Sequence, residues 1–261
     1  MSTDAPLLQA DDPDPVMRAR PDGTSDFVII VDHAGRRIPR RLGDLGVPAS
    51  ELERHIAWDI GAWAVALALS ETLDAALIGQ AYSRLVIDCN RDPAVESAIV
   101  TLSETTPIPG NVGVTDEEIA ARREAIFDPY HARIRALLDD RRARGRRTVL
   151  IALHSMTDVY KGETRPMQCA VLYNRDARFA QILLGVLRDE PGLTVGDNAP
   201  YSVSDVSDYT IPRHAEARGL AHVEIEMRQD LITGETGQAE WAERMAAALT
   251  AADALFQERY P

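Results

Sequence analysis

Short runs of apolar residues alternate along the chain with longer stretches in which apolar positions recur at helical spacing. The short runs predict strands at residues 27–31, 77–78, 85–87, 148–153, 168–172 and 222–227. The helical spacing predicts helices over residues 51–73, 115–144, 177–188 and about 236–256. Because strands and helices alternate, we expect a three-layer α/β fold, with helices on both faces of a mostly parallel mixed sheet.

Two local signals refine the second predicted helix. A capping box that begins at Thr115 and includes Glu118 predicts its start, and Asp128-Pro129 predicts a break or kink inside it. The preceding residues, 93–114, form a long connection rich in Thr, Pro and Gly. A connection of that length is uncommon in a compact domain unless it is functional.

Polar residues stand where three of the predicted strands end, and two of these strands end on a histidine. The first run stops on His33, and the run before Ser155 stops on His154. Ligands of α/β sheets bind just beyond the carboxyl ends of the strands. A single strand-end histidine is more often structural, but two in matching contexts indicate a metal site, because zinc is held by imidazole nitrogens and carboxylates. His131, in contrast, has the context of a residue that packs a helix.

A third metal ligand is suggested by Asp59, which is embedded in the apolar segment Ile56-Ala57-Trp58-Asp59-Ile60. A carboxylate in such surroundings should be paired or bound to a metal. A simple helix pair with His55, four residues earlier, is the alternative.

Acids alternate with apolar residues in the strand predicted at 222–227. Glu224 and Glu226 therefore point to one face, opposite Val223 and Ile225. A solvated edge strand would explain this pattern, but an interior strand would direct an acid into a site. A carboxylate there can deprotonate a metal-activated water and later protonate a leaving amine.

Arg84, Asn90 and Arg91 flank the strand predicted at 85–87. Arginine guanidinium groups bind carboxylates through two parallel hydrogen bonds, and asparagine adds a donor. Together they predict a subsite for an anionic substrate.

Composition limits the class of protein. The chain has 261 residues, of which 45% are hydrophobic and 26% charged, as in ordinary globular domains. No apolar run approaches the roughly 20 residues that cross a membrane, and the N-terminus lacks the pattern of a secretory signal. We therefore expect no membrane partner. The two cysteines, Cys89 and Cys169, are too few for a disulfide framework and stand in apolar surroundings, so we expect a cytoplasmic location. A net charge of −13 argues against a nucleic-acid partner. The oligomeric state stays open.

The polar residues 1–24 predict a flexible N-terminal arm. The remainder, residues 25–261, is predicted to form a single domain.

Several of these segments together resemble the N-formylglutamate amidohydrolase family over roughly residues 26 to 245. The resemblance is carried by Asp32-His33-Ala34-Gly35, Ser83-Arg84-Leu85-Val86-Ile87-Asp88, Asn90-Arg91-Asp92, Ile108-Pro109-Gly110-Asn111, Pro129-Tyr130-His131, Leu153-His154-Ser155 and Val223-Glu224-Ile225-Glu226. The family is similar to the zinc carboxypeptidases and aspartoacylases, which implies a phosphorylase/hydrolase-like α/β fold.

The resemblance also implies roles for individual residues. His33 and His154 would be zinc ligands, with Asp59 matching an aspartate of the family, and Glu226 would be the general base. Arg84 would polarise the scissile carbonyl or bind a carboxylate.

Further residues are assigned to the substrate by the same resemblance. Asn90 and Arg91 would hold a substrate carboxylate, and Tyr209 and His214 match a family segment near the substrate. Two departures are visible: Arg36 stands where carboxypeptidases place a ligand glutamate, and the loop at 103–111 differs from the usual family sequence.

The expected activity is zinc-dependent hydrolysis of the N-acyl amide of a small acidic amino acid. The leading candidate is N-formyl-L-glutamate, which would yield formate and glutamate. Three other functions remain alternatives: a metallo-carboxypeptidase, a deacylase for other acyl-amino acids, and a non-catalytic metal-binding homologue. The metal could also be a divalent ion other than zinc. A metal-free serine hydrolase at Ser155 is a poor candidate, because the Gly-x-Ser-x-Gly motif is absent.

Overall fold

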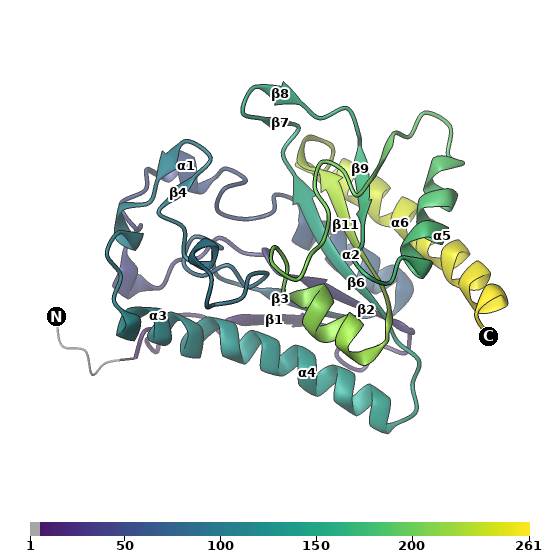
Figure 1. The fold of residues 1–261 in the computed structure, drawn as a ribbon, viewed down its shortest axis with the longest axis horizontal. Helices are drawn as coiled ribbons and strands as arrows, with labels where there is room; N and C mark the ends of the chain where they lie inside the picture. The colour runs from purple at the N-terminus through teal and green to yellow at the C-terminus, as the bar shows by residue number, and fades with distance from the viewer. Residues whose placement is uncertain (1–5) are drawn as a thin grey trace.

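A seven-stranded mixed sheet forms the centre of the protein in the computed structural model, which describes residues 6–261 (Figure 1). The strands lie in the order β1-β3-β2-β6-β11-β9-β10. Their bounds are β1 Val16–Ala19, β2 Phe27–Val31, β3 Ala76–Gln80, β6 Val149–Met156, β9 Cys169–Leu172, β10 Val195–Asp197 and β11 Ala221–Arg228. The four central strands, β3, β2, β6 and β11, are parallel, so the predicted fold class is confirmed.

The edges of the sheet differ from its centre. On one side β1 pairs antiparallel with β3, and on the other β9 pairs antiparallel with β11 and parallel with β10. Two short hairpins lie outside the sheet, formed by β4 Leu102–Ser103 with β5 Thr106–Pro107 and by β7 Val159–Tyr160 with β8 Glu163–Thr164.

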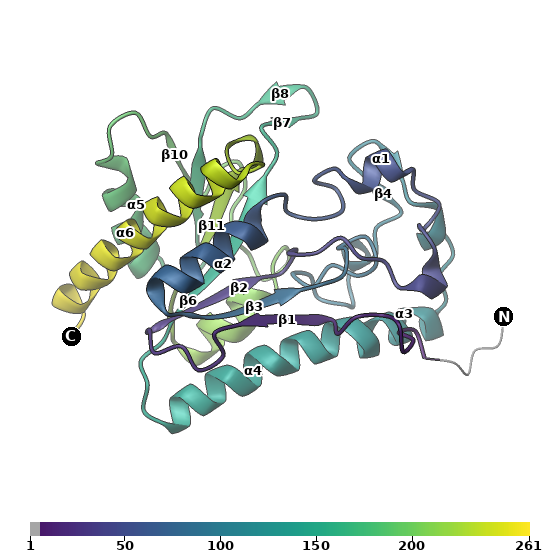
Figure 2. The same cartoon turned by 180° about the vertical axis from the view of Figure 1, so that it is seen from behind.

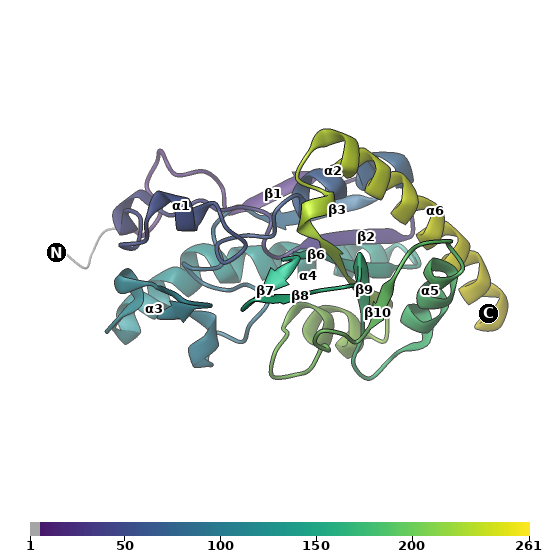
Figure 3. The same cartoon turned by 90° about the horizontal axis from the view of Figure 1, so that it is seen from above.

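Helices cover both faces of the sheet (Figures 1 and 3). The α-helices are α1 Ala49–Leu52, α2 Ala62–Leu73, α3 Asp116–Arg122, α4 Asp128–Ala143, α5 Arg178–Arg188 and α6 Glu235–Arg259. Two π-helical turns span Arg123–Phe127 and Ile211–Ala215, and 3₁₀ turns span Arg40–Leu42, Glu96–Ala98, Pro109–Asn111, Glu216–Arg218 and Gln229–Leu231. None of the helices in this part of the chain has the length and apolar character to cross a membrane.

Strand β2 shows how the two cores arise from alternation. Phe27, Ile29 and Val31 face a core shared with α2, α5 and α6, the layer seen in Figure 2. Val28 and Ile30 face the opposite core, which α4 covers. All five residues are buried. A parallel strand covered on both faces is apolar throughout, which explains the unbroken apolar runs in the sequence.

The prediction of one helix over residues 51–73 is wrong for the first half of this segment. It is divided into α1 and α2, and residues 53–61 form turns between them. Gly61 has a φ of +79° and lies so close to Ile232 that a Cβ atom would fall 2.2 Å from the carbonyl oxygen of that residue. The backbone N–H of Asp59 donates to the carbonyl of His33 instead of to a helical partner. Tertiary hydrogen bonds therefore replace the helix here and deliver Asp59 to the end of β2.

The strand predicted at residues 85–87 is also wrong, because this segment forms turns. Ser83 organises it: the Ser83 carbonyl accepts from the N–H of Val86, and the Ser83 hydroxyl accepts from the N–H of Leu85. The three apolar side chains are buried in the core beneath α4. These side chains are apolar because the loop that carries them is buried, not because the segment is a strand of the sheet.

The predicted N-terminal arm does not describe residues 16–19. They form β1, whose register pairs Val16 with Gln80 and Ala19 with Leu77. An antiparallel edge strand needs one apolar face only, and the polar surroundings of this segment hide it in the sequence. Residues 1–5, also assigned to the arm, lie outside the described part of the chain.

The helix predicted over 115–144 is present but interrupted. The capping box is confirmed, because Thr115 accepts from the N–H of Glu118 while the Glu118 carboxylate accepts from the N–H of Thr115. The predicted break near Asp128 takes the form of the π-helical turn Arg123–Phe127 directly before it.

Candidate metal centre and substrate cavity

Two histidines and one aspartate meet at the carboxyl end of the central strands. The Asp59 Oδ2 atom lies 2.8 Å from His154 Nδ1 and 3.3 Å from His33 Nδ1. All three side chains are buried, with about 3% of each residue exposed. They come from three elements: the turn after β2, the turn before α2, and β6. This cluster has the ligand types to hold a metal ion.

Each histidine has an aspartate on its other ring nitrogen. His33 Nε2 lies 2.8 Å from Asp88 Oδ1, and His154 Nε2 lies 3.4 Å from Asp32 Oδ2. Asp32 is itself fixed, because its Oδ1 atom accepts from the hydroxyls of Tyr130 and Thr210. Carboxylates in this position orient metal-binding histidines, and here they would leave both Nδ1 atoms for a metal ion.

The protonation equilibria of the cluster reflect these carboxylates. Burial, and secondly Arg84, act to lower the pKa of His33, but Asp88 and Asp59 outweigh them and the pKa is raised. Burial likewise opposes protonation of His154, yet nearby acids hold its pKa well above the ordinary value. Burial opposes ionisation of Asp59, but the two histidines outweigh it and its pKa is lowered.

The residues present fit a bound metal. Two buried carboxylate oxygens beside the cluster, Glu224 Oε2 and Glu226 Oε2, have no hydrogen-bond partner among the described residues. Such atoms are costly in a protein interior unless something compensates them. In addition, ligand atoms around a tetrahedral zinc ion with its usual bond lengths lie about 3.3 Å apart, close to the separations at Asp59.

Glu226 enters the same cavity from β11. The parallel register pairs it with His154 on β6, and the two side chains emerge on the same face. The Glu226 Oε1 atom accepts from the Tyr201 hydroxyl at 2.5 Å. Burial raises the pKa of Glu226, partly offset by His154. The carboxyl group is thus positioned beside the candidate ligands with one oxygen held and the other without a partner in the described chain.

Glu224, two residues earlier, also lines this cavity. Its side chain is buried, and burial raises its pKa well above the ordinary value. The alternation of acids in the sequence is therefore a property of the cavity face, not of a solvated edge strand.

Arg84 lies between the acids of the cluster. Its Nη2 atom donates to Asp88 Oδ2 at 2.6 Å, and its Nη1 atom lies 3.9 Å from Asp59 Oδ1. Asp88 ends the segment Ser83-Arg84-Leu85-Val86-Ile87-Asp88, and the sequence pattern assigns it no role of its own. Here it joins Arg84 to His33 and is therefore central to the site.

Asn90 performs a structural task in this chain. Its Oδ1 atom accepts from the backbone N–H groups of Tyr209 and Thr210, and its Nδ2 atom donates to Asp208. The side chain therefore fastens the loop at 201–210 over the cavity. Arg91 lines the cavity too, with its Nη1 atom 3.0 Å from the Asn90 carbonyl oxygen.

Tyr209 and His214 are not brought to the cavity. His214 is buried, and its Nε2 atom lies 2.8 Å from His131 Nδ1. Tyr209 packs its ring against Phe127 and His131 and lines a separate depression beside α3. Neither residue lines the cavity, and their substrate contacts stay predictions. The π-helical turn that contains His214 directs its ring towards α4, where His131 packs as the sequence predicted.

The cavity has a volume of about 460 Å³. The sequence pattern assigns no place in the cavity to several residues that line it, which lie in turns, loops and the short strand β7: His55, Glu104, Thr157, Tyr160, Arg165 and Tyr201. Ser155 also lines it, but its hydroxyl donates to the Ile60 carbonyl at 2.8 Å, so it is occupied as a structural donor.

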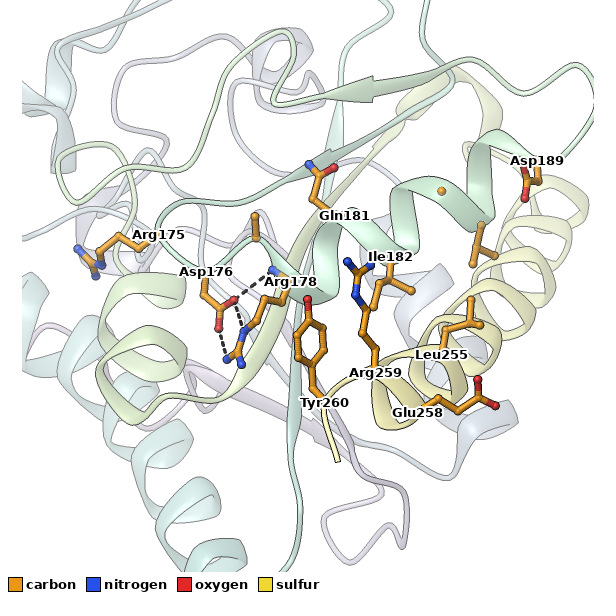
Figure 4. Close-up of a pocket in the computed structure, with 13 residues that line it drawn as sticks. Arg175, Asp176, Arg178, Gln181, Ile182, Asp189, Leu255, Glu258, Arg259 and Tyr260 are labelled. Carbon is orange, nitrogen blue, oxygen red and sulfur yellow. Dashed lines mark hydrogen bonds and ion pairs between the residues drawn. The ribbon is translucent and has the colours of Figure 1, made fainter.

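A larger groove lies elsewhere, between α5 and the end of α6 (Figure 4). Its lining includes Arg178, which is paired with Asp176, and the exposed ends of Gln181 and Arg259. None of the described residues that line this groove is a histidine or cysteine. The chemistry-bearing residues are therefore concentrated in the smaller cavity.

Comparisons with known proteins agree with the fold. A structure of gene product Atu2144 from Agrobacterium tumefaciens is 36% identical, with a TM-score of 0.93, covering 96% of this chain and 99% of that one. N-formylglutamate amidohydrolase from Ralstonia eutropha JMP134 has the same fold, at 19% identity and a TM-score of 0.65, covering 94% of this chain and 99% of that one. No curated protein is matched.

The family model for N-formylglutamate amidohydrolase matches residues 25–233. This span includes all of the candidate metal ligands, the predicted base Glu226 and the cavity-lining arginines. The chain belongs to the N-formylglutamate amidohydrolase family.

Proposed function

We propose that this protein is a metal-dependent amidohydrolase that cleaves the N-acyl amide of an acidic amino acid. The leading substrate is N-formyl-L-glutamate, which water would split into formate and L-glutamate. One observation carries the proposal: His33, Asp59, His154 and Glu226 converge in a single buried cavity of a chain from this family.

The metal would be held by His33 Nδ1, His154 Nδ1 and the Asp59 carboxylate. Zinc suits two imidazole nitrogens and one carboxylate, with a position left open for substrate or water. A bound Zn²⁺ supplies Lewis acidity, which makes water more acidic and the acyl carbonyl more electrophilic. Asp88 and Asp32 would keep both histidines in the tautomer that presents Nδ1 to the ion.

Glu226 would act as the proton carrier. Its carboxylate would accept a proton from the attacking water, and the protonated acid would then donate it to the nitrogen of the breaking amide bond. The water oxygen forms the new bond to the acyl carbon, the C–N bond breaks, and the amine leaves neutral. The Tyr201 hydroxyl holds the other carboxyl oxygen and so fixes the direction of transfer.

Arg84 and Arg91 would bind the negative charges of the substrate. Both line the cavity, and Arg84 is the nearer to the candidate metal ligands. Burial opposes the charge of Arg84, but Asp88 and Asp59 outweigh it and raise its pKa, so it remains a cation throughout the reaction. Positive charge at the cavity would attract an anionic substrate although the chain as a whole carries −13.

The assay is formate release from N-formyl-L-glutamate by protein reconstituted with one equivalent of Zn²⁺. A panel of N-formyl, N-acetyl and C-terminal peptide substrates separates deformylation from deacylation and from carboxypeptidase activity. Turnover of an N-acyl acidic amino acid, lost on chelation and restored by metal, is the expected result. Full metal occupancy without turnover of any member of the panel would contradict the proposal and favour a non-catalytic homologue.

A further inference from the structure

One arginine of the cavity has no neutralising carboxylate among the described residues. Arg165, which follows β8, lines the cavity with the candidate metal ligands. The other two cavity arginines are near acids: Arg84 pairs with Asp88, and Arg91 lies 3.8 Å from Asp208. Within the described chain, no Asp or Glu pairs with the Arg165 guanidinium. A cation in this state is a natural partner for an anionic ligand.

The position of Arg165 is fixed from several sides. Its backbone N–H donates to the Asp158 carbonyl at 2.8 Å, and its own carbonyl accepts from Arg228 at 3.1 Å. The guanidinium lies 5.2 Å from the ring centre of Tyr160 and 5.6 Å from that of Tyr201. One terminal N–H donates to the Thr157 carbonyl at 3.4 Å, and no further hydrogen bond joins the guanidinium to the described residues. Aromatic stacking and backbone anchoring reduce the entropy that would be lost on binding.

Tyr201 connects this arginine to the candidate base. Its hydroxyl donates to Glu226 while its ring packs against the Arg165 guanidinium. The cation is therefore separated by one tyrosine side chain from the group that would act on the amide. The side-chain carboxylate of a glutamate-length substrate lies two bonds further from the α-carbon than the α-carboxylate. It is therefore the carboxylate with the longer reach from the amide towards Arg165.

We propose that Arg165 binds the side-chain carboxylate of the substrate and so makes the cavity selective for N-acyl acidic amino acids. This inference rests on the proposed amidohydrolase function and names the residue responsible for its selectivity. Arg84 and Arg91 are then left for the α-carboxylate. Arg228, which ends the strand of Glu226, links the arginine to the catalytic strand through its bond to the Arg165 carbonyl.

The test compares N-formyl-L-glutamate with N-formyl-L-glutamine, which differ only in the side-chain carboxylate. Arg165→Met removes the charge and keeps the length of the side chain. Loss of a charge-assisted hydrogen bond pair should lower kcat/KM for the glutamate derivative by about 10–100-fold, mainly through KM. The glutamine derivative should be nearly unaffected, and Arg165→Lys should restore part of the selectivity. Equal losses on both substrates, or no loss on either, would overturn the proposal.

Lys161→Met is the matched control. Lys161 lies in the same hairpin, 5.4 Å from the same Tyr160 ring, but it does not line the cavity. Its replacement should leave the ratio of the two kcat/KM values unchanged. A change as large as that of Arg165→Met would show that the effect comes from the hairpin and would contradict the assignment.

A binding experiment separates this inference from the reaction. Calorimetric titration of L-glutamate and L-glutamine into metal-loaded protein needs no turnover. Wild-type protein should bind glutamate more tightly, and Arg165→Met should lose that preference. This result would support the role of Arg165 even if no amide is cleaved. Equal binding of the two amino acids by wild-type protein would refute it.

Discussion

Glu226 lies beside His154 because β11 and β6 are parallel and in a register that pairs these two residues. Neighbouring strands place paired side chains on the same face, here the face that bounds the cavity. The candidate base and one candidate ligand are thus positioned by two central strands of the sheet. The loops supply the remaining parts: His33, Asp59 and Arg84.

Glu226→Gln should abolish turnover while the metal remains bound. The amide has nearly the same shape but cannot accept the proton, and general base catalysis contributes about 10²–10⁴-fold to rate. The measurement is kcat together with metal content by elemental analysis. Unchanged kcat at full occupancy would rule out Glu226 as the base. Tyr201→Phe, which removes only the hydroxyl that contacts Glu226, should have a smaller effect.

Asp88→Asn should weaken metal binding without removing a ligand. Asp88 contacts His33 Nε2, and loss of such a carboxylate lowers metal affinity by about 10–100-fold. Affinity is measured by competition with a chromogenic chelator. Arg84→Met is the control, because it removes the other partner of Asp88 and leaves the contact to His33. Equal weakening in both variants would show that the arginine, not the histidine contact, controls affinity.

The pair of buried histidines predicts a loss of stability in mild acid. Burial lowers the pKa of His131 to about 4, and burial followed by His131 lowers the pKa of His214 to about 2. Both residues ionise near 6.5 in the unfolded chain. The two neutral histidines therefore contribute fully to the stability of the folded protein above pH 6.5. This contribution is lost as the pH falls from 6.5 towards 4.

Urea unfolding of the metal-free protein across this pH window measures the effect. The free energy of unfolding of the wild-type protein should fall steadily as the pH is lowered through this window. His214→Gln removes one titrating group, so its stability should depend less steeply on pH, whatever its absolute value. An unchanged slope would show that the pair does not control acid sensitivity.

Asp74→Asn should destabilise the edge of the sheet at neutral pH. The hydroxyl and N–H of Thr24, together with Arg20, lower the pKa of Asp74 to about 2. Because this pKa is below that of the unfolded chain, the carboxylate stabilises the fold above about pH 4 and ceases to do so as pH falls through about 2. Asparagine tolerates the left-handed backbone of this position, where φ is 51°.

Thermal unfolding at several pH values measures this prediction. The difference between wild type and Asp74→Asn should be largest near neutral pH and shrink towards pH 2. Asp22→Asn, in the same exposed corner, should match wild type. A difference that stays constant with pH would indicate a cause other than the charge of Asp74.

The central strands could be predicted from the sequence because burial on both faces leaves a continuous apolar signature. The runs at 27–31, 148–153 and 222–227 correspond to β2, β6 and β11. Their polar residues, His33, His154 and Glu226, were predicted to lie near one another because parallel strands end at the same edge. These predictions depend on local pattern and on a general rule of α/β sheets.

Asp59 and Arg165 needed the tertiary structure. Periodicity placed Asp59 inside a helix, but Gly61 and hydrogen bonds to distant backbone groups place it in a turn. No local pattern marks Arg165, whose significance comes from the rings of Tyr160 and Tyr201 and from the absence of a paired acid among the described residues.

By itself, the sequence determined the core strands of the sheet, the strand-end positions of the two histidines, the acid on the last central strand and the family resemblance. Each of these follows from residue types and short spacings along the chain. Only the tertiary structure decided that Asn90 fastens a loop, that His214 pairs with His131, and that Asp88 connects His33 to Arg84. Each of these contacts joins segments whose meeting depends on packing and loop closure, which the spacing of residues along a chain does not encode.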